Sequence, residues 1–149
     1  MFNRDHNAIV AIKDEKVGTY KFRWLNYGAP FDRCGSKEES VAYLLLNKYN
    51  NKRRVRKLLG FGNLERVSYP MVPENVDVSK PAHATIDGQM GWPSIPEMVY
   101  KTSAEGIHWY YIFEKGHWHI CDGRMIVDLK QYLDHDGMSM FSVGETFGL

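Results

Sequence analysis

Apolar and polar residues alternate most clearly along residues 107–121, which predicts a β-hairpin with a tight turn at Lys115-Gly116. Side chains of a strand point alternately to the two sides of a sheet, so the hairpin has two faces. The face expected to join the core carries Trp109, Tyr111, Phe113, Trp118 and Ile120. The other face carries His108, Tyr110, Ile112, Glu114, His117, His119 and Cys121. This second face is unusually rich in polar and ligand-capable groups, so it is one of two places where we look for function.

A second hairpin is predicted near the N-terminus. Residues 8–12 form a short apolar run, and residues 17–24 alternate so that Tyr20, Phe22 and Trp24 share one face. The polar residues 13–16 lie between the two segments and predict the turn. We expect the three rings to contribute to the same core as the aromatic hairpin.

Two helices are expected between the hairpins. Ser36 and Glu39 match a capping box, and Val41, Leu44, Leu45 and Tyr49 then recur at helical spacing. Asn50 and Asn51 end this helix and offer a cap to the next, which covers residues 52–59. The apolar stripe of the second helix is Val55, Leu58 and Leu59, and Gly60 and Gly62 predict its end.

Residues 68–96 hold five of the six prolines and predict a long ordered loop, with short strands near residues 84–86 and 98–100. A loop of this length in a compact domain is often functional. Asp122-Gly123 predicts a turn, and residues 124–133 a short C-terminal helix. The predicted fold is therefore α+β, a mainly antiparallel sheet of two β-hairpins with an αα-hairpin packed on one face. We expect both aromatic faces to contact the leucines of these helices.

Length and composition limit the class of protein. The 149 residues fit a single domain, and 44% hydrophobic and 25% charged residues are ordinary for a soluble globular chain. The net charge of +1 gives no overall attraction to nucleic acid. The two cysteines do not form a disulfide framework, and no apolar run approaches the length of a membrane span. We therefore expect a soluble intracellular protein with no membrane partner, and whether it forms a homo-oligomer stays open.

The order of these motifs resembles a family of small accessory proteins of tailed phages and prophages. The likeness lies in an apolar strand, the aromatic-rich turn of residues 22–28, the leucine-rich helix of residues 44–50, a charged helix closing on residues 58–64, and the aromatic hairpin. It covers roughly residues 7–67 and 105–133. The resemblance implies an α+β fold, a phage origin and a place in the host cytoplasm, and it implies no catalytic activity.

The second place where we look for function is the basic helix. Five cations stand within six residues, at Lys52, Arg53, Arg54, Arg56 and Lys57. Guanidinium groups at a helix start favour phosphate, and aromatic rings provide stacking surfaces for bases. We name Arg53, Arg54, Arg56, Lys57, Trp24, Tyr27 and Trp92 as ligand-binding candidates. The plainer interpretation, which we favour, is a solvated helix face whose charges are balanced by acidic residues elsewhere.

Histidines give weaker hypotheses. His117, His119 and Cys121 lie at alternate positions and offer zinc ligands, although their spacing matches no known zinc motif, and we expect no bound metal or cofactor. His83-Ala-Thr85 resembles one of the two His-x-Thr motifs of certain phosphoesterases, with residues 117–119 as an incomplete second. His83, His117 and His119 are therefore weak catalytic candidates. A solvated strand face with one buried thiol is the simpler explanation.

These observations favour a phage accessory protein that acts by binding. Its partner would be either a host or defence protein or an anionic ligand such as a nucleotide, held by the basic helix and the loop of residues 68–96. One alternative is a small enzyme that acts on a nucleotide or nucleic acid through histidines. Another is a minor structural component of the virion.

Overall fold

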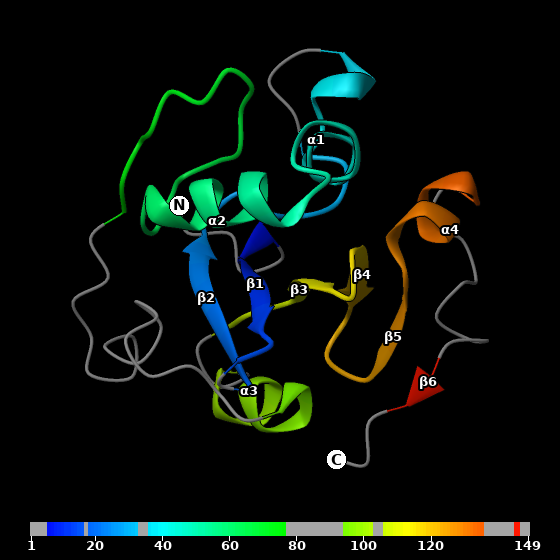
Figure 1. The fold of residues 1–149 in the computed structure, drawn as a ribbon. Helices are drawn as coiled ribbons and strands as arrows, with labels where there is room; N and C mark the ends of the chain where they lie inside the picture. The colour runs from blue at the N-terminus through cyan, green and yellow to red at the C-terminus, as the bar shows by residue number, and fades with distance from the viewer. Residues whose placement is uncertain are drawn as a thin grey trace.

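The fold is a mixed β-sheet with helices on both of its faces (Figure 1). The computed structural model describes residues 6–16, 18–32, 36–76, 94–102, 106–135 and 145–146. The N-terminal half contains β1 (Ala8–Asp14), β2 (Thr19–Leu25), the 3₁₀ turn η2 (Lys37–Glu39), α1 (Val41–Lys48) and α2 (Lys52–Gly60). The C-terminal half contains α3 (Ile95–Thr102), β3 (Trp109–Glu114), β4 (His117–Cys121), β5 (Met125–Asp128), α4 (Leu129–Asp134) and β6 (Glu145–Thr146).

The six strands are ordered β2-β1-β3-β4-β5-β6. Neighbouring strands are antiparallel except β1 and β3, which run parallel, with Ala8 opposite Trp109 and Ile12 opposite Phe113. Parallel neighbours need a long crossover, and the described part of the chain between β2 and β3 contains α1, α2 and α3. The predicted α+β class is confirmed, but the sheet is mixed rather than built only from antiparallel hairpins.

Both predicted hairpins are present. β1 pairs with β2, and β3 pairs with β4 so that Glu114 lies opposite His117. The two residues between Glu114 and His117 have positive φ angles, 55° at Lys115 and 79° at Gly116. Two successive positive φ angles match the right-handed twist of the strands, which explains the tight turn that the sequence predicts.

The second central helix begins and ends close to the predicted positions, but the first begins five residues after the predicted cap at Ser36, whose side chain makes no cap hydrogen bond. Ser36 contacts Glu39 at 3.4 Å, but this pair belongs to η2, and α1 begins after Ser40. The side chain of Asn51 accepts a hydrogen bond from the Arg54 amide at 2.9 Å and caps α2 as predicted. The buried residues of α2 are those of the predicted stripe, and α1 buries Ala42 in addition to its predicted Val41, Leu44 and Leu45.

The sheet separates two apolar clusters. One cluster joins the aromatic face of the β3–β4 hairpin, including Tyr111, Phe113 and Trp118, to the buried residues of α1, α2 and α4. Tyr20, Phe22 and Trp24 lie in the other cluster, together with Met98 and Val99 of α3. The expectation that these three rings contact the leucines of the αα-hairpin is therefore wrong.

The three rings are covered instead by α3, where a short strand at residues 98–100 was predicted. Ser94 accepts a hydrogen bond from the Glu97 amide at 3.2 Å, and Pro96 lies in the first turn of the helix. Ser94-x-x-Glu97 is a capping box that the sequence already contained. Because α3 covers the second face, residues 8–12 of β1 are all buried, as in a central strand.

The structure differs from the prediction in the C-terminal segment, and part of the predicted loop lies outside the described residues. Residues 124–133 contain a short helix, but it begins only at Leu129, after the additional strand β5. Residues 77–93, with the strand predicted at 84–86, lie outside the described part of the chain. None of the helices in the described ranges has the length and apolar character needed to cross a bilayer.

Candidate anion-binding surface around α2

The basic helix α2 lies across β1 and β2 with its apolar stripe toward the sheet (Figure 1). Val55, Leu58 and Leu59 are buried, whereas every lysine and arginine of the helix is exposed. This division follows from the sequence, because the apolar positions repeat at helical spacing and the intervening positions are cationic. The cations therefore form the outer surface of the helix.

Most of these cations have no partner among the residues that the structure describes. The side chains of Lys52, Arg53, Arg56 and Lys57 form no hydrogen bond or ion pair with any residue in the described ranges. The first turn of α2 contains no acidic residue, although the partial positive charge of a helix N-terminus favours anions there. Each exposed cation in a first turn costs about 0.3–1 kcal/mol. The helix thus carries an unfavourable charge arrangement that a bound anion would relieve.

The largest of three hollows beside α2 has a volume of about 600 Å³, and we call it the Tyr69 hollow. Lys48, Arg53, Arg54 and Lys57 provide its charged lining, and Tyr69 provides a ring that is 50% exposed. None of the described residues that line it is acidic. The hollow therefore combines positive charge with an accessible aromatic surface.

Contacts with neighbouring residues hold the aromatic wall of the Tyr69 hollow in place. The Tyr49 ring meets the Tyr69 ring edge-on, with centroids 6.0 Å apart, and the Tyr49 hydroxyl donates to the Ser68 carbonyl at 2.6 Å. Burial raises the pKa of Tyr49 to about 12, so its phenol stays neutral and remains a donor. The Lys48 ammonium lies 5.3 Å from the centre of the Tyr69 ring. Tyr69 is thus held by contacts with Tyr49 and Lys48, while half of the residue remains exposed.

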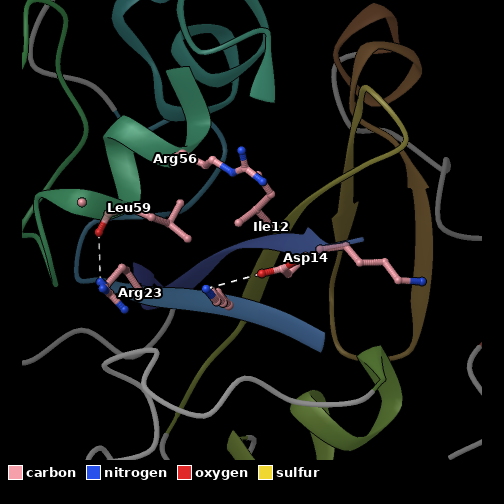
Figure 2. Close-up of a pocket in the computed structure, with 8 residues that line it drawn as sticks. Ile12, Asp14, Arg23, Arg56 and Leu59 are labelled. Atoms are coloured by element: carbon pink, nitrogen blue, oxygen red, sulfur yellow. Dashed lines mark hydrogen bonds and ion pairs between the residues drawn. The ribbon is translucent and has the colours of Figure 1, made fainter. Parts of the chain in front are cut away.

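A second hollow lies between α2 and the β1–β2 hairpin, and we call it the Arg56 hollow (Figure 2). It has a volume of about 240 Å³ and is lined by Lys13, Lys21, Arg23 and Arg56 against a single acid, Asp14. Figure 2 shows Arg56 extending from α2 on one side and Arg23 lying below the helix end on the other. Hydrogen bonds to Leu59 O at 3.0 Å and Phe22 O at 3.1 Å fix the Arg23 guanidinium. Asp14 is already engaged by Lys21 at 3.5 Å, which leaves the Arg56 charge unneutralised within the described residues.

A third hollow of about 480 Å³ lies at the start of α2, and we call it the Lys52 hollow. Its charged lining is Lys13, Glu15, Lys52, Glu114 and Lys115. It shares Asn51 with the Tyr69 hollow and Ile12 and Lys13 with the Arg56 hollow. The three hollows therefore adjoin one another around α2.

The Glu114 carboxylate in this third hollow is already satisfied. It accepts hydrogen bonds from Lys13 at 3.1 Å and from the Tyr20 hydroxyl at 2.9 Å. Burial alone would raise the pKa of Glu114, but these two donors outweigh burial and hold the pKa below its usual range. Glu114 is thus ionised at neutral pH and neutralises Lys13 rather than Lys52.

The structure brings some of the predicted ligand-binding residues together and separates others. Arg53, Arg54 and Lys57 line the Tyr69 hollow, whereas Arg56 lines the Arg56 hollow on the other flank of the helix. Lys52, Arg53, Arg56 and Lys57 form no ion pair with an acidic residue in the described ranges, and all four are exposed, as on the solvated helix face of the plainer interpretation. The cations of α2 therefore lie on two opposite flanks of the helix and line different hollows.

The predicted aromatic partners are placed elsewhere. Trp24 is 4% exposed and buried in the cluster on the other face of the sheet. Tyr27 is exposed but lines none of the three hollows, and its ring lies 5.2 Å from the guanidinium of Arg66. Trp92 lies outside the described residues. The ring beside the basic helix is instead Tyr69, at the start of the loop of residues 68–96.

The histidine candidates are remote from this surface. His117 and His119 alternate with Trp118 and Ile120, so they lie on the sheet face opposite α2, and they line none of the three hollows. Cys121 on the same face is fully buried, and burial raises the pKa of its thiol to about 12. No group of three or more His, Cys, Asp or Glu side chains placed to hold a metal ion occurs within the described residues. His83 lies outside them.

Comparison with protein-family models, with curated proteins and with solved structures finds no match to this chain. Its function is therefore inferred from the geometry and charge of the surface around α2.

Proposed function

We propose that the protein binds a phosphate-bearing small molecule, of which a nucleotide is the best-fitting kind, in the Tyr69 hollow. The observation that carries the proposal is the lining of this hollow. Four cations surround an exposed tyrosine ring, and none of the described lining residues is acidic. Phosphate oxygens would accept hydrogen bonds from Arg53, Arg54 and Lys57, while a base would stack on Tyr69.

The size and chemistry of the hollow favour a nucleotide over a simple inorganic anion. A volume of about 600 Å³ falls within the range of small-molecule sites, whereas an inorganic phosphate would fill only a small part of it. An aromatic ring gives no advantage to an ion that has no flat apolar part. A ligand with both a ring and a phosphate uses the whole lining.

The role that we assign to this binding is sequestration. It follows the resemblance to phage accessory proteins, and on this proposal the protein retains a host or defence nucleotide without converting it. The described lining of the Tyr69 hollow holds no carboxylate or imidazole, the groups that most often transfer protons in enzymes.

The proposal is tested by isothermal titration calorimetry of the full chain with ATP, with adenosine and with inorganic phosphate. We expect ATP to bind more tightly than either fragment, because only ATP contacts both the ring and the cations. The double variant Arg53→Gln/Lys57→Gln should lower the affinity for ATP about tenfold per removed cation, or roughly 1.4 kcal/mol each. Tyr69→Ala should weaken binding, and Tyr69→Phe should preserve it.

The matched control is Arg124→Gln/Lys130→Gln, which removes the same charge from exposed positions on the β4–β5 turn and on α4. Its ATP affinity should equal that of the wild type. If both double variants lower the ATP affinity equally, the loss of affinity results from the change in net charge and the proposed site is wrong. Absence of ATP binding by the wild-type chain would also refute the proposal.

A further inference from the structure

The charges of this protein are strongly segregated. The chain as a whole has 19 cations and 18 acids, yet ten cations and only three acids line the three hollows around α2. The surface around α2 is therefore much more positive than the net charge of +1 suggests. A field of this kind attracts a polyanion even when the whole molecule is nearly neutral.

A mononucleotide does not account for all of this surface. The cations of α2 point to opposite flanks of a helix that is about 10–12 Å across with its side chains. A nucleotide stacked on Tyr69 engages Arg53, Arg54 and Lys57, and leaves Arg56 on the far flank without a partner among the described residues. Arg56 faces the hollow in which Arg23 is already fixed by two carbonyls. A ligand with several phosphates along its length would reach both flanks.

We infer that the ligand of this surface is a short segment of single-stranded nucleic acid that passes around the start of α2. The inference rests on the proposed function and extends the ligand beyond the Tyr69 hollow. One base stacks on Tyr69, the adjoining phosphates contact Arg53, Arg54 and Lys57, and a later phosphate enters the Arg56 hollow. The Lys52 hollow provides the path between the two flanks.

Two features favour a single strand over a duplex. The exposed Tyr69 ring can stack only on a base that is unpaired and accessible. The continuous path around a helix end also requires a backbone that bends sharply, which a double helix resists. The lining contacts act on phosphates and on the flat face of a base, so they distinguish poorly between base sequences.

The test compares ATP with a fluorescent single-stranded deoxyadenosine hexamer, by anisotropy competition at several salt concentrations. We expect the hexamer to bind at least tenfold more tightly than ATP. Its logarithmic affinity should fall with logarithmic salt concentration with a slope of about −0.7 for each phosphate contact, so three or more contacts give about −2 or steeper.

Variants on the two flanks separate this inference from the proposed function. Arg56→Gln should weaken the hexamer and reduce its salt slope by about 0.7 while leaving ATP affinity unchanged. Arg53→Gln should weaken both ligands, and Arg124→Gln should weaken neither. Arg56 is exposed and unpartnered within the described residues, so its replacement should not disturb folding.

The outcomes are distinguishable. If ATP binds, the hexamer binds no more tightly than ATP, and Arg56→Gln does not change the hexamer affinity, the nucleic-acid inference is refuted. The proposed nucleotide site then stands. If the hexamer binds but ATP does not bind measurably, single-stranded nucleic acid is supported as the ligand. The proposal that the protein binds a nucleotide is then refuted. A duplex that outcompetes the single strand overturns the inference, and failure of both probes overturns both proposals.

Discussion

Trp118 joins the sheet to the end of α1, and its replacement tests the architecture that supports the basic surface. Its side chain is 3% exposed, its ring meets Phe113 edge-on with centroids 5.2 Å apart, and its indole nitrogen donates to the Tyr49 carbonyl at 2.8 Å. Tyr49 in turn supports the Tyr69 ring. We therefore predict that Trp118→Ala strongly destabilises the fold.

The expected loss of unfolding free energy in Trp118→Ala is the sum of two contributions, the loss of ring packing and the loss of a hydrogen bond. Removal of a buried tryptophan ring leaves a cavity that costs about 3–5 kcal/mol, and the Tyr49 carbonyl loses a donor in a buried setting, which adds about 1 kcal/mol. Trp118→Phe keeps a ring against Phe113 but also loses the donor, so we expect a loss of about 1–2 kcal/mol. Small domains have a total stability of about 5–15 kcal/mol, so the first variant removes a large fraction of it.

The assay is equilibrium unfolding in urea followed by circular dichroism. Trp109→Ala is the matched control, because Trp109 packs against the same cluster but is only partly buried. Trp109→Ala should lower the unfolding free energy clearly less than Trp118→Ala does. If Trp118→Ala unfolds within about 1 kcal/mol of the wild type, or if the two tryptophans are equally costly, Trp118 does not occupy a core position and the reasoning fails. Trp118→Phe keeps the test valid if the alanine variant does not fold.

Two further predictions concern titratable groups. Because burial raises the pKa of the Cys121 thiol to about 12, peptide mapping after iodoacetamide treatment at pH 8 should find Cys121 unmodified in the native protein and modified in urea; rapid native labelling would contradict its burial. Glu114 has a lowered pKa in the fold, so its charge stabilises the native state above the usual glutamate value of 4.5, and this stabilisation is lost as the pH falls through the native pKa. The difference in unfolding free energy between wild type and Glu114→Gln should therefore be largest at neutral pH and shrink below about pH 4.5; a difference independent of pH would show that the ion pair with Lys13 is not its source.

Local sequence patterns correctly predicted those elements whose structure depends mainly on neighbouring residues, namely the β3–β4 hairpin and α2. The alternation in residues 107–121 and the turn at Lys115-Gly116 specify the β3–β4 hairpin, because register and turn geometry are local properties. The apolar stripe and asparagine cap likewise specify α2. These features need no knowledge of distant parts of the chain.

The pairing of β1 with β3 was not predictable in the same way. It joins residues about one hundred positions apart, and nothing in either strand encodes its parallel direction. Alternation identified which residues share a face, but it did not identify what covers that face. Tyr20, Phe22 and Trp24 were correctly grouped and wrongly assigned, since the element that buries them is α3. Recognising the Ser94-x-x-Glu97 capping box would have supplied the missing layer.

The same distinction applies to the functional surface. A run of cations in sequence is a local signal, so the cations of α2 were predictable as candidates. Whether those cations have acidic partners, and which ring lies beside them, depends on the segments that fold against the helix. The structure places Lys48 and Tyr69 there and directs Trp24 to the opposite face of the sheet. A charged segment becomes a candidate site when some of its cations keep no protein partner after folding and lie beside an exposed aromatic ring. Arg53 and Lys57 of α2 meet both conditions within the described residues.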